Sequence, residues 1–248
     1  MDKTQDNKNA DAITRLLEKI SNGENPKKLR REATRLMSNV LPVDIARAEQ
    51  NMIASGYSEQ IVQNLSSAFM LMGILEDQIL NVKAKLPANH IVRKVIAEHD
   101  LTRCYLAELE DVNKEIQEMD EISDVSLQFR KLTHIIQHLD AMEEHIEREE
   151  DVIFPALKKH GWTALCRASM SDHVYIRIAV SDLVKLIAGF NTTKPDEFKA
   201  RLKSITKYLT TRLRDHLFHE ENILYPIALE LMKDKQVWKK IKDVCEEI

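Results

Sequence analysis

HIEREEDVIFP, at residues 145–155, returns 71 residues later in the chain as HLFHEENILYP, at residues 216–226. A weaker match lies upstream of each stretch, and its two copies are EHDLTR at residues 98–103 and DHVYIR at residues 172–177. The chain therefore uses one helix pair twice. The first helix of each pair carries a single histidine, and the second carries a histidine followed four residues later by a glutamate. Such a repeat is expected to fold with approximate two-fold symmetry.

Long helices are predicted around this repeat. Only five glycines and six prolines occur among 248 residues, about a third of average usage, which disfavours turn-rich folds and predicts an all-α protein. Apolar residues at helical spacing predict four long helices and a short last one, at residues 90–118, 125–159, 164–189, 196–225 and 227–247. Four long helices with short connections predict an up-down-up-down four-helix bundle.

The residues before this bundle are predicted to form a separate helical part. Leu86-Pro87-Ala88-Asn89 is the predicted boundary, because proline disfavours helix at the residue before it and Asn89 can cap a new helix. Four short amphipathic helices are predicted before it, with no cluster of histidines, cysteines or paired acids. We expect a flexible N-terminus at residues 1–10, a helical module for packing or partner recognition at 11–85, and the bundle with its short last helix at 88–248.

Composition argues against several classes of function. The five glycines lie too far apart to build a phosphate-binding loop, and a net charge of −4 with mixed signs leaves no basic footprint for nucleic acid. No stretch reaches the roughly 18 apolar residues of a membrane span, and residues 1–10 lack the apolar core of a signal peptide. Three cysteines without a C-x-x-C pair argue against a disulfide framework or a thiolate metal site. A soluble, cytoplasmic protein is expected.

The repeat gathers side chains that bind metals. Residues four apart on a helix differ by about 40° around its axis and about 6 Å along it, so each histidine shares a face with the glutamate four residues later. Carboxylates turned into an apolar bundle would each lose several kcal/mol of hydration unless cations neutralise them. The candidate metal ligands, four imidazoles and two carboxylates, are His99, His145, Glu149, His173, His216 and Glu220.

The two-fold repeat indicates two metal ions, each held by two histidines, with both glutamates bridging. Mixed imidazole and carboxylate donors in an octahedral setting suit iron or manganese better than zinc, which prefers four ligands. One position on each metal would stay open for an external ligand. The ferritin-type order Glu-x-x-His and the zinc-protease motif His-Glu-x-x-His are not used here.

The order of these residues, with the dipeptides Phe154-Pro155 and Tyr225-Pro226, resembles the hemerythrin-like (HHE cation-binding) family over about residues 88–234. Residues 41–56 resemble an uncharacterised helical module found ahead of hemerythrin-like domains in some bacterial and archaeal proteins. The resemblance implies a non-haem di-iron centre, with two irons per chain and an oxo or hydroxo bridge, that binds dioxygen, nitric oxide or peroxide. It implies terminal ligand roles for the four histidines and bridging roles for the two glutamates.

Two departures from the family bear on its function. Oxygen-carrying hemerythrins have a second histidine one turn after the third-helix ligand, where this chain has Arg177, and arginine cannot ligate a metal. The iron-centre repair branch usually adds an N-terminal segment with a cysteine, whereas the first cysteine here is Cys104. The first departure favours sensing or reactivity over oxygen carriage, and the second is a departure from the repair branch.

The residues around the ligands receive other predictions. The remaining histidines are assigned as inward-facing packing groups (His134, His138), a cap or surface group (His90), a helix end (His160) and a position off the ligand face (His219). Tyr225 aligns with Phe154 in the repeat, so ring shape alone is taken to explain it. Arg103 and Arg177 are predicted to pair with acids beside the ligands, either Glu98 and Asp172 or Glu150 and Glu221, or to form plain surface ion pairs.

These observations predict a di-iron protein that binds a small ligand for sensing or detoxification. One alternative is a regulatory or scaffold protein whose metal site is only structural. Another is a factor for iron handling or the repair of iron–sulfur centres. The N-terminal module is predicted to dock a protein partner or to make a homodimer.

Overall fold

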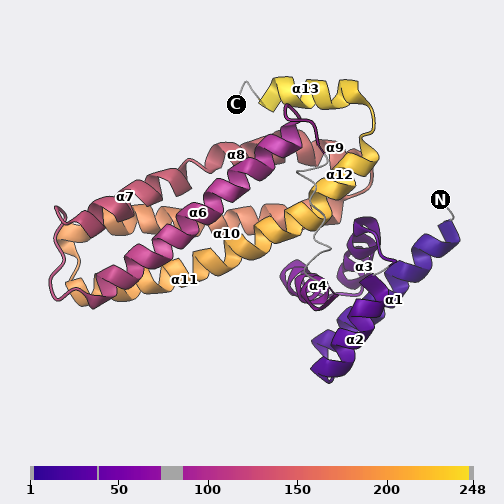
Figure 1. The fold of residues 1–248 in the computed structure, drawn as a ribbon, viewed down its shortest axis with the longest axis horizontal. Helices are drawn as coiled ribbons and strands as arrows, with labels where there is room; N and C mark the ends of the chain where they lie inside the picture. Colours follow the sequence, from indigo (N-terminus) through magenta and orange to yellow (C-terminus); the bar gives the residue numbers. More distant parts are fainter. Residues whose placement is uncertain (1–2, 38, 74–85, 246–248) are drawn as a thin grey trace.

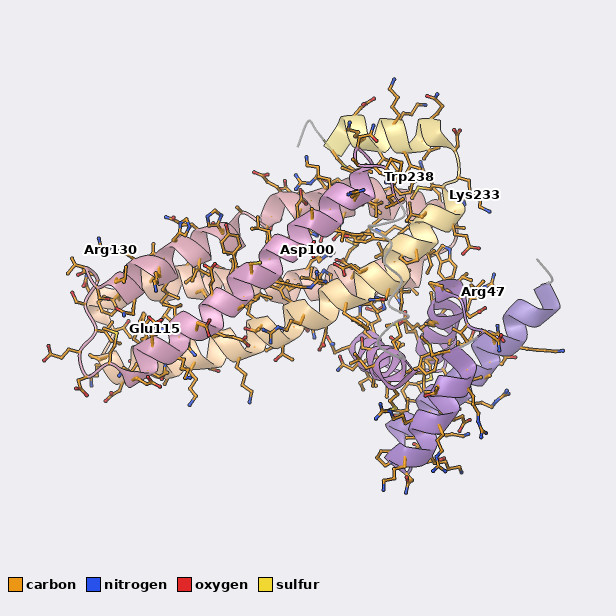
Figure 2. The ribbon with its side chains drawn as sticks, in the orientation of Figure 1. Arg47, Asp100, Glu115, Arg130, Lys233 and Trp238 are labelled. Carbon is orange, nitrogen blue, oxygen red and sulfur yellow. The ribbon has the colours of Figure 1, made fainter. Side chains whose placement is uncertain are left out.

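A computed structural model describes residues 3–37, 39–73 and 86–245, and every regular element in these ranges is helical (Figure 1). The predicted all-α class is therefore confirmed. Charged side chains such as Glu115 and Arg130 project outward from the long helices (Figure 2). None of the described helices has the length and the apolar composition needed to cross a membrane.

The N-terminal part consists of the four predicted helices, α1 (Lys3–Ser21), α2 (Pro26–Met37), α3 (Pro42–Ala54) and α4 (Glu59–Gly73). Proline stands at the first turn of α2 and α3, where its missing N–H costs nothing. The turns that follow α1 and α3 contain Gly23 and Gly56 at φ of 70° and 97°, which other residues rarely adopt. Helix α1 begins at Lys3, inside the stretch at 1–10 that was expected to be flexible. Residues 74–85 of the expected module lie outside the described residues.

The bundle is built from four long helical segments that run up and down beside one another (Figure 1). Helix α6 packs on α7 and on α11, and α10 packs on the same two helices. The elements in chain order are α6 (Ile91–Glu118), α7 (Leu127–Asp140), α8 (Glu143–Arg148), η1 (Glu149–Ile153), α9 (Phe154–Lys159), α10 (Thr163–Ala188), η2 (Phe190–Thr192), α11 (Pro195–His219), η3 (Glu220–Leu224), α12 (Tyr225–Leu231) and α13 (Lys235–Cys245).

Two predicted helices are interrupted. The helix expected over 125–159 breaks at residues 141–142, between α7 and α8. Farther on, α8 widens into a π turn, η1, and α11 widens into a second one, η3. Each turn is followed by an aromatic residue and a proline. Proline lacks an N–H and its ring clashes with the carbonyl four residues earlier, so the wider turn lets the helix continue past Pro155 and Pro226.

The N-terminal part lies against one end of the bundle. Helix α3 contacts η3, α10 and α12, and α4 contacts α10 and α11. One apolar core extends from α1 to the residues of η1 and η3, and a second core fills the distal half of the bundle. A belt of buried polar side chains separates these two cores, and it contains all six predicted metal ligands.

Candidate metal centre

The structure brings the six predicted ligands together as two overlapping groups. One group is His99, His145, Glu149 and Glu220, and the other is Glu149, His173, His216 and Glu220. Within each group the candidate ligand atoms lie within 4.8 Å of one another. All six side chains are buried, and both glutamates, which belong to both groups, are 0% exposed. Two histidine pairs thus share two carboxylates, in the arrangement that the repeat predicted.

The repeat positions each ligand by local geometry. The single histidines come from α6 and α10, the other two come from α8 and the end of α11, and each glutamate is the first residue of a π turn. In η1 the Phe154 N–H donates to the Glu149 carbonyl, and in η3 the Tyr225 N–H donates to the Glu220 carbonyl. Such a bond from residue i+5 to residue i places the aromatic residue nearly above the glutamate, whereas an α-helix would turn it about 140° away.

A carboxylate and an arginine stand behind each histidine. Three of the histidines donate a hydrogen bond from Nδ1–H to a carboxylate: His99 to Glu221 (2.9 Å), His145 to Glu98 (2.9 Å) and His173 to Glu150 (2.7 Å). His216 Nδ1 lies 3.5 Å from Asp172, a looser contact. The ion pairs behind them are Arg103 with Glu221 at 2.7 Å, Arg148 with Glu98 at 2.9 Å, Arg177 with Glu150 at 2.9 Å and Arg212 with Asp172 at 2.8 Å.

These outer pairs decide between the alternatives for Arg103 and Arg177. Both arginines hold acids that bind a histidine, Glu221 and Glu150, and not the neighbouring Glu98 and Asp172. The latter two acids instead support the histidines of the following helix, with Arg148 and Arg212 behind them. Sequence reasoning missed those two arginines.

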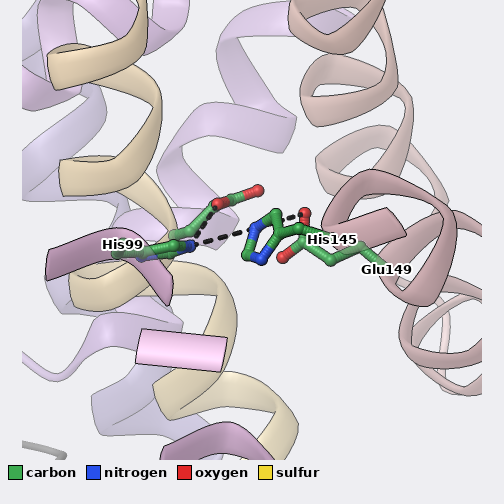
Figure 3. A group of neighbouring side chains, drawn as sticks. His99, His145 and Glu149 are labelled. Carbon is green, nitrogen blue, oxygen red and sulfur yellow. Dashed lines mark hydrogen bonds and ion pairs between the residues drawn. The ribbon is translucent and has the colours of Figure 1, made fainter. Parts of the chain in front are cut away.

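The carboxylates orient the imidazoles for metal binding. A histidine that donates from Nδ1 to a carboxylate presents the lone pair of Nε2, which is how such side chains are held at metal sites. The Nε2 atoms of His99 and His145 lie 3.2 Å apart, and those of His173 and His216 lie 3.1 Å apart. Figure 3 shows the rings of His99 and His145 turned toward each other. Two nitrogen lone pairs at this distance repel each other unless a cation or a proton stands between them.

The spacing of the nitrogens fits a metal ion. Two donors at right angles around an ion, each about 2.1 Å from it, lie about 3.0 Å apart, whereas tetrahedral donors lie about 3.4 Å apart. The observed separations, 3.2 Å and 3.1 Å, lie between these two values and fit two donors around one ion. Glu149 Oε2 and both carboxylate oxygens of Glu220 are buried and accept no hydrogen bond from a described residue. Buried carboxylate oxygens without donors are costly, and cations at this place would satisfy them.

Proton affinities in the site reflect its negative charge. Burial lowers the pKa of His99, as it does for an imidazole among apolar groups. At His173 burial acts in the same direction, but the nearby carboxylates of Glu149, Glu150 and Glu220 outweigh it and hold the pKa well above 6.5. Burial also lowers the pKa of His216, but the negative charge of Glu220 outweighs this effect and the pKa rises to about 9. The carboxylates thus attract positive charge into the centre, whether it is carried by protons or by metal ions.

Tyr225 and His219 contact the site in ways that the sequence did not predict. The Tyr225 hydroxyl lies 2.5 Å from Glu149 Oε1 and 3.2 Å from His99 Nε2, so its ring shape is not the whole explanation. His219 points off the ligand face, as expected, and reaches Glu49 of α3 at 2.9 Å. The hydroxyl of Ser66 in α4 donates to the same buried carboxylate. The turn that carries Glu220 is thereby joined to the N-terminal helices through a buried polar contact.

The other histidines lie outside the centre. His90 caps α6, accepting from the Val92 N–H, and His160 is the exposed C-cap of α9, as predicted. His134 is exposed and His138 is half-buried; the ring of His138 stacks on Tyr105 and meets the ring of His134 edge-on. The inward orientation expected for them is therefore wrong. The break between α7 and α8 changes the helical register, so a stripe extrapolated back from His145 does not hold.

Two families match the chain. The Hemerythrin HHE cation binding domain matches residues 76–228, and a family of unknown function, DUF438, matches residues 13–71. The two matches follow the division into a bundle and an N-terminal helical part. No curated protein matches this chain.

Proposed function

Because this chain belongs to the hemerythrin family of HHE cation-binding domains, we propose that it is a cytoplasmic non-haem di-iron protein. In this proposal its centre binds a small ligand, namely dioxygen, nitric oxide or peroxide. His99 and His145 would hold one iron, His173 and His216 the other, and Glu149 and Glu220 would bridge them with a shared oxo or hydroxo group. When bound, the two irons would supply an open coordination position and redox chemistry.

The observation that carries the proposal is the pair of buried carboxylates shared by two histidine pairs. Three of their four oxygens accept no hydrogen bond from a described residue, and four Nε2 atoms face them. In a metal-free protein this arrangement would destabilise the folded state, since apolar side chains of similar volume would pack more stably there. Its retention is explained if the site holds cations.

The residues around the centre would keep it dry and poised. Ile153 and Phe154 on one side, and Ile223 and Leu224 on the other, are fully buried beside the ligands. An apolar wall of this kind excludes bulk water and controls which molecules reach a metal. It suits a small, uncharged diatomic ligand, and the position of Arg177 in an ion pair with Glu143 and Glu150 removes one ligand from the family's oxygen-carrying set.

Sensing is favoured over detoxification by one further contact. The buried Glu49 of α3 joins His219, which immediately precedes Glu220, so movement of η3 on ligand binding would be felt directly in the N-terminal helices. A detoxifying enzyme would not need this contact, whereas a sensor needs a path from the metal to a docking surface. We propose that the N-terminal module carries that surface, for a protein partner or a second copy of the chain.

Metal reconstitution tests the proposal. Purified protein loaded with ferrous iron under nitrogen and then oxidised is expected to hold two irons per chain and to show oxo-bridged charge-transfer absorption in the near ultraviolet. The double variant Glu149→Ala with Glu220→Ala should lose both irons while retaining its helical content. A matched double variant, Glu147→Ala with Asp151→Ala, removes the same charge from exposed positions and should keep both irons.

Spectra recorded after the addition of dioxygen, nitric oxide and peroxide in turn distinguish the candidate functions. A change with one of these ligands supports the proposed function. Iron that stays bound with an unchanged spectrum would indicate a structural site in a scaffold protein. Iron that passes readily to an acceptor protein would indicate iron handling or repair. A wild-type protein that binds no iron would overturn the proposal.

A further inference from the structure

The two halves of the centre differ at one aromatic position. Phe154 and Tyr225 follow the two π turns at equivalent places in the repeat, and both rings stack on a histidine of the opposite pair. Phe154 lies over His173 with ring centres 5.7 Å apart, and Tyr225 lies over His99 with ring centres 5.5 Å apart. Both side chains are fully buried, so the repeat treats them alike except for one hydroxyl group.

That hydroxyl stands among the candidate ligand atoms. Around His99 Nε2, the nearest donor atoms are His145 Nε2 at 3.2 Å, the Tyr225 hydroxyl at 3.2 Å and Glu220 Oε2 at 3.4 Å. The hydroxyl oxygen is therefore as far from His99 as the second histidine is. These separations lie within the range of about 3.0–3.4 Å that is expected of two donors around one ion.

The other half offers no counterpart. Around His173 Nε2, the nearest donors are His216 Nε2 at 3.1 Å, Glu149 Oε2 at 3.3 Å and Glu220 Oε1 at 3.7 Å. Phe154 fills the place of the tyrosine with a ring edge that cannot ligate. Glu149 and Glu220 belong to both halves, so the Tyr225 hydroxyl gives the His99 half a third oxygen donor that the His173 half lacks.

We propose that Tyr225 is a fifth protein ligand, as a phenolate, of the metal held by His99 and His145, and that the small ligand therefore binds at the other metal. This inference rests on the proposed di-iron function and adds an asymmetry that the ligand motif does not contain. Ligation replaces the O–H bond with an O–metal bond. The phenol proton is released to solvent as the bond to the metal forms, and no atom changes oxidation state.

The electrostatics agree with a phenolate that forms only beside a metal. Burial, together with the charges of Glu149 and Glu220, raises the pKa of Tyr225 well above 10. Without cations the phenol therefore stays protonated and donates to Glu149. Two ferric ions would reverse the sign of the local field and stabilise the phenolate, as metal ions do for other coordinated acids.

The test is visible and resonance Raman spectroscopy of the oxidised, iron-loaded protein, with iron counted in every sample. Phenolate bound to ferric iron gives a visible charge-transfer band and enhanced ring vibrations. We expect both in the wild type, their loss in Tyr225→Phe, and no change in Tyr208→Phe, which removes a hydroxyl from an exposed ring. The isosteric Tyr225→Phe change should leave two irons bound.

A second variant tests the asymmetry itself. Phe154→Tyr places a hydroxyl at the equivalent position of the other half, so we expect the visible band to increase and nitric oxide binding to be lost. Two irons per chain without a phenolate band in the wild type, or a band that persists in Tyr225→Phe, would overturn the ligand role while leaving the di-iron function intact. Nitric oxide binding undiminished in Phe154→Tyr would overturn the assignment of the open metal. Failure to bind iron at all would overturn the di-iron function and this inference with it.

Discussion

Replacing Glu150 with glutamine tests how strongly the outer carboxylates hold the metal ligands. Glu150 accepts from His173 Nδ1 at 2.7 Å, the shortest of the four histidine contacts, and pairs with Arg177 at 2.9 Å. Burial raises its pKa, but the bonds and charges of His173 and Arg177 outweigh this and lower it to about 2. The side chain is therefore ionised throughout the neutral range. Glutamine keeps the size and an acceptor oxygen but removes the charge that holds the imidazole.

The magnitude follows from the role of such partners. Loss of a carboxylate behind a metal-bound histidine typically costs 10–100-fold in metal affinity, which is about 1.4–2.7 kcal/mol. Because this contact is short and the carboxylate is also fixed by an arginine, we expect Glu150→Gln to lie in the upper part of that range. Ferrous iron affinity, measured under nitrogen by competition with a colorimetric chelator, gives the value.

A matched control separates this effect from simple loss of charge. Asp151 is the next residue of the same π turn and is exposed, so Asp151→Asn removes the same charge without touching a histidine. We expect its affinity to stay within about twofold of the wild type, because exposed charges interact weakly through water. Equal affinities for Glu150→Gln and Asp151→Asn would refute the idea that the outer carboxylate positions the ligand.

Three other predictions concern stability, reactivity and pH. Glu49→Ala leaves His219 and Ser66 without their buried partner and should lower the free energy of unfolding by about 3–5 kcal/mol. At an unfolding entropy of about 2.1 cal/mol/K per residue, the melting temperature should fall by about 6–10 °C. Gln50→Ala, which loses only an exposed contact to Gly161, should change it little, and an unshifted melting curve for Glu49→Ala would refute the importance of the Glu49 contact. Native protein treated with a thiol reagent at pH 8 should be labelled at exposed Cys104 and not at buried Cys166, and rapid labelling of Cys166 would refute the described packing. Burial raises the pKa of the Cys166 thiol to about 11, above its value in the unfolded chain. The stability that the neutral thiol contributes is therefore complete below about pH 8.5 and should be lost as the pH rises toward 11. Free energies of unfolding that fall in parallel for the wild type and Cys166→Ala over this pH interval would contradict the prediction.

The sequence was sufficient for the parts of the structure that depend on local spacing. The four long helical segments of the bundle, the shared face of His145 and Glu149, and the start of α6 follow from helical periodicity and from proline. The repeat supplied the remaining step, since two copies of one motif predict a paired site. These are all statements about residues close together in the chain.

The features that escaped prediction depend on contacts between distant segments. Glu49 and His219 are 170 residues apart, and nothing in either neighbourhood indicates the other. The π turns escaped prediction because an unbroken helix was expected over 125–159 and the helix at 196–225 was expected to stop before Pro226, whereas in both places a wider turn lets the helix continue. Tyr225 was matched to Phe154 by alignment, and only the turn geometry shows its hydroxyl among the ligand atoms.

The central claim, that two irons lie between the four histidines, is tested most directly by anomalous X-ray diffraction at the iron edge from crystals of iron-loaded protein. We predict two anomalous peaks per chain, one beside His99 and His145 and one beside His173 and His216, with Glu149 and Glu220 between them. A single peak, or iron bound only at the surface, would contradict this assignment.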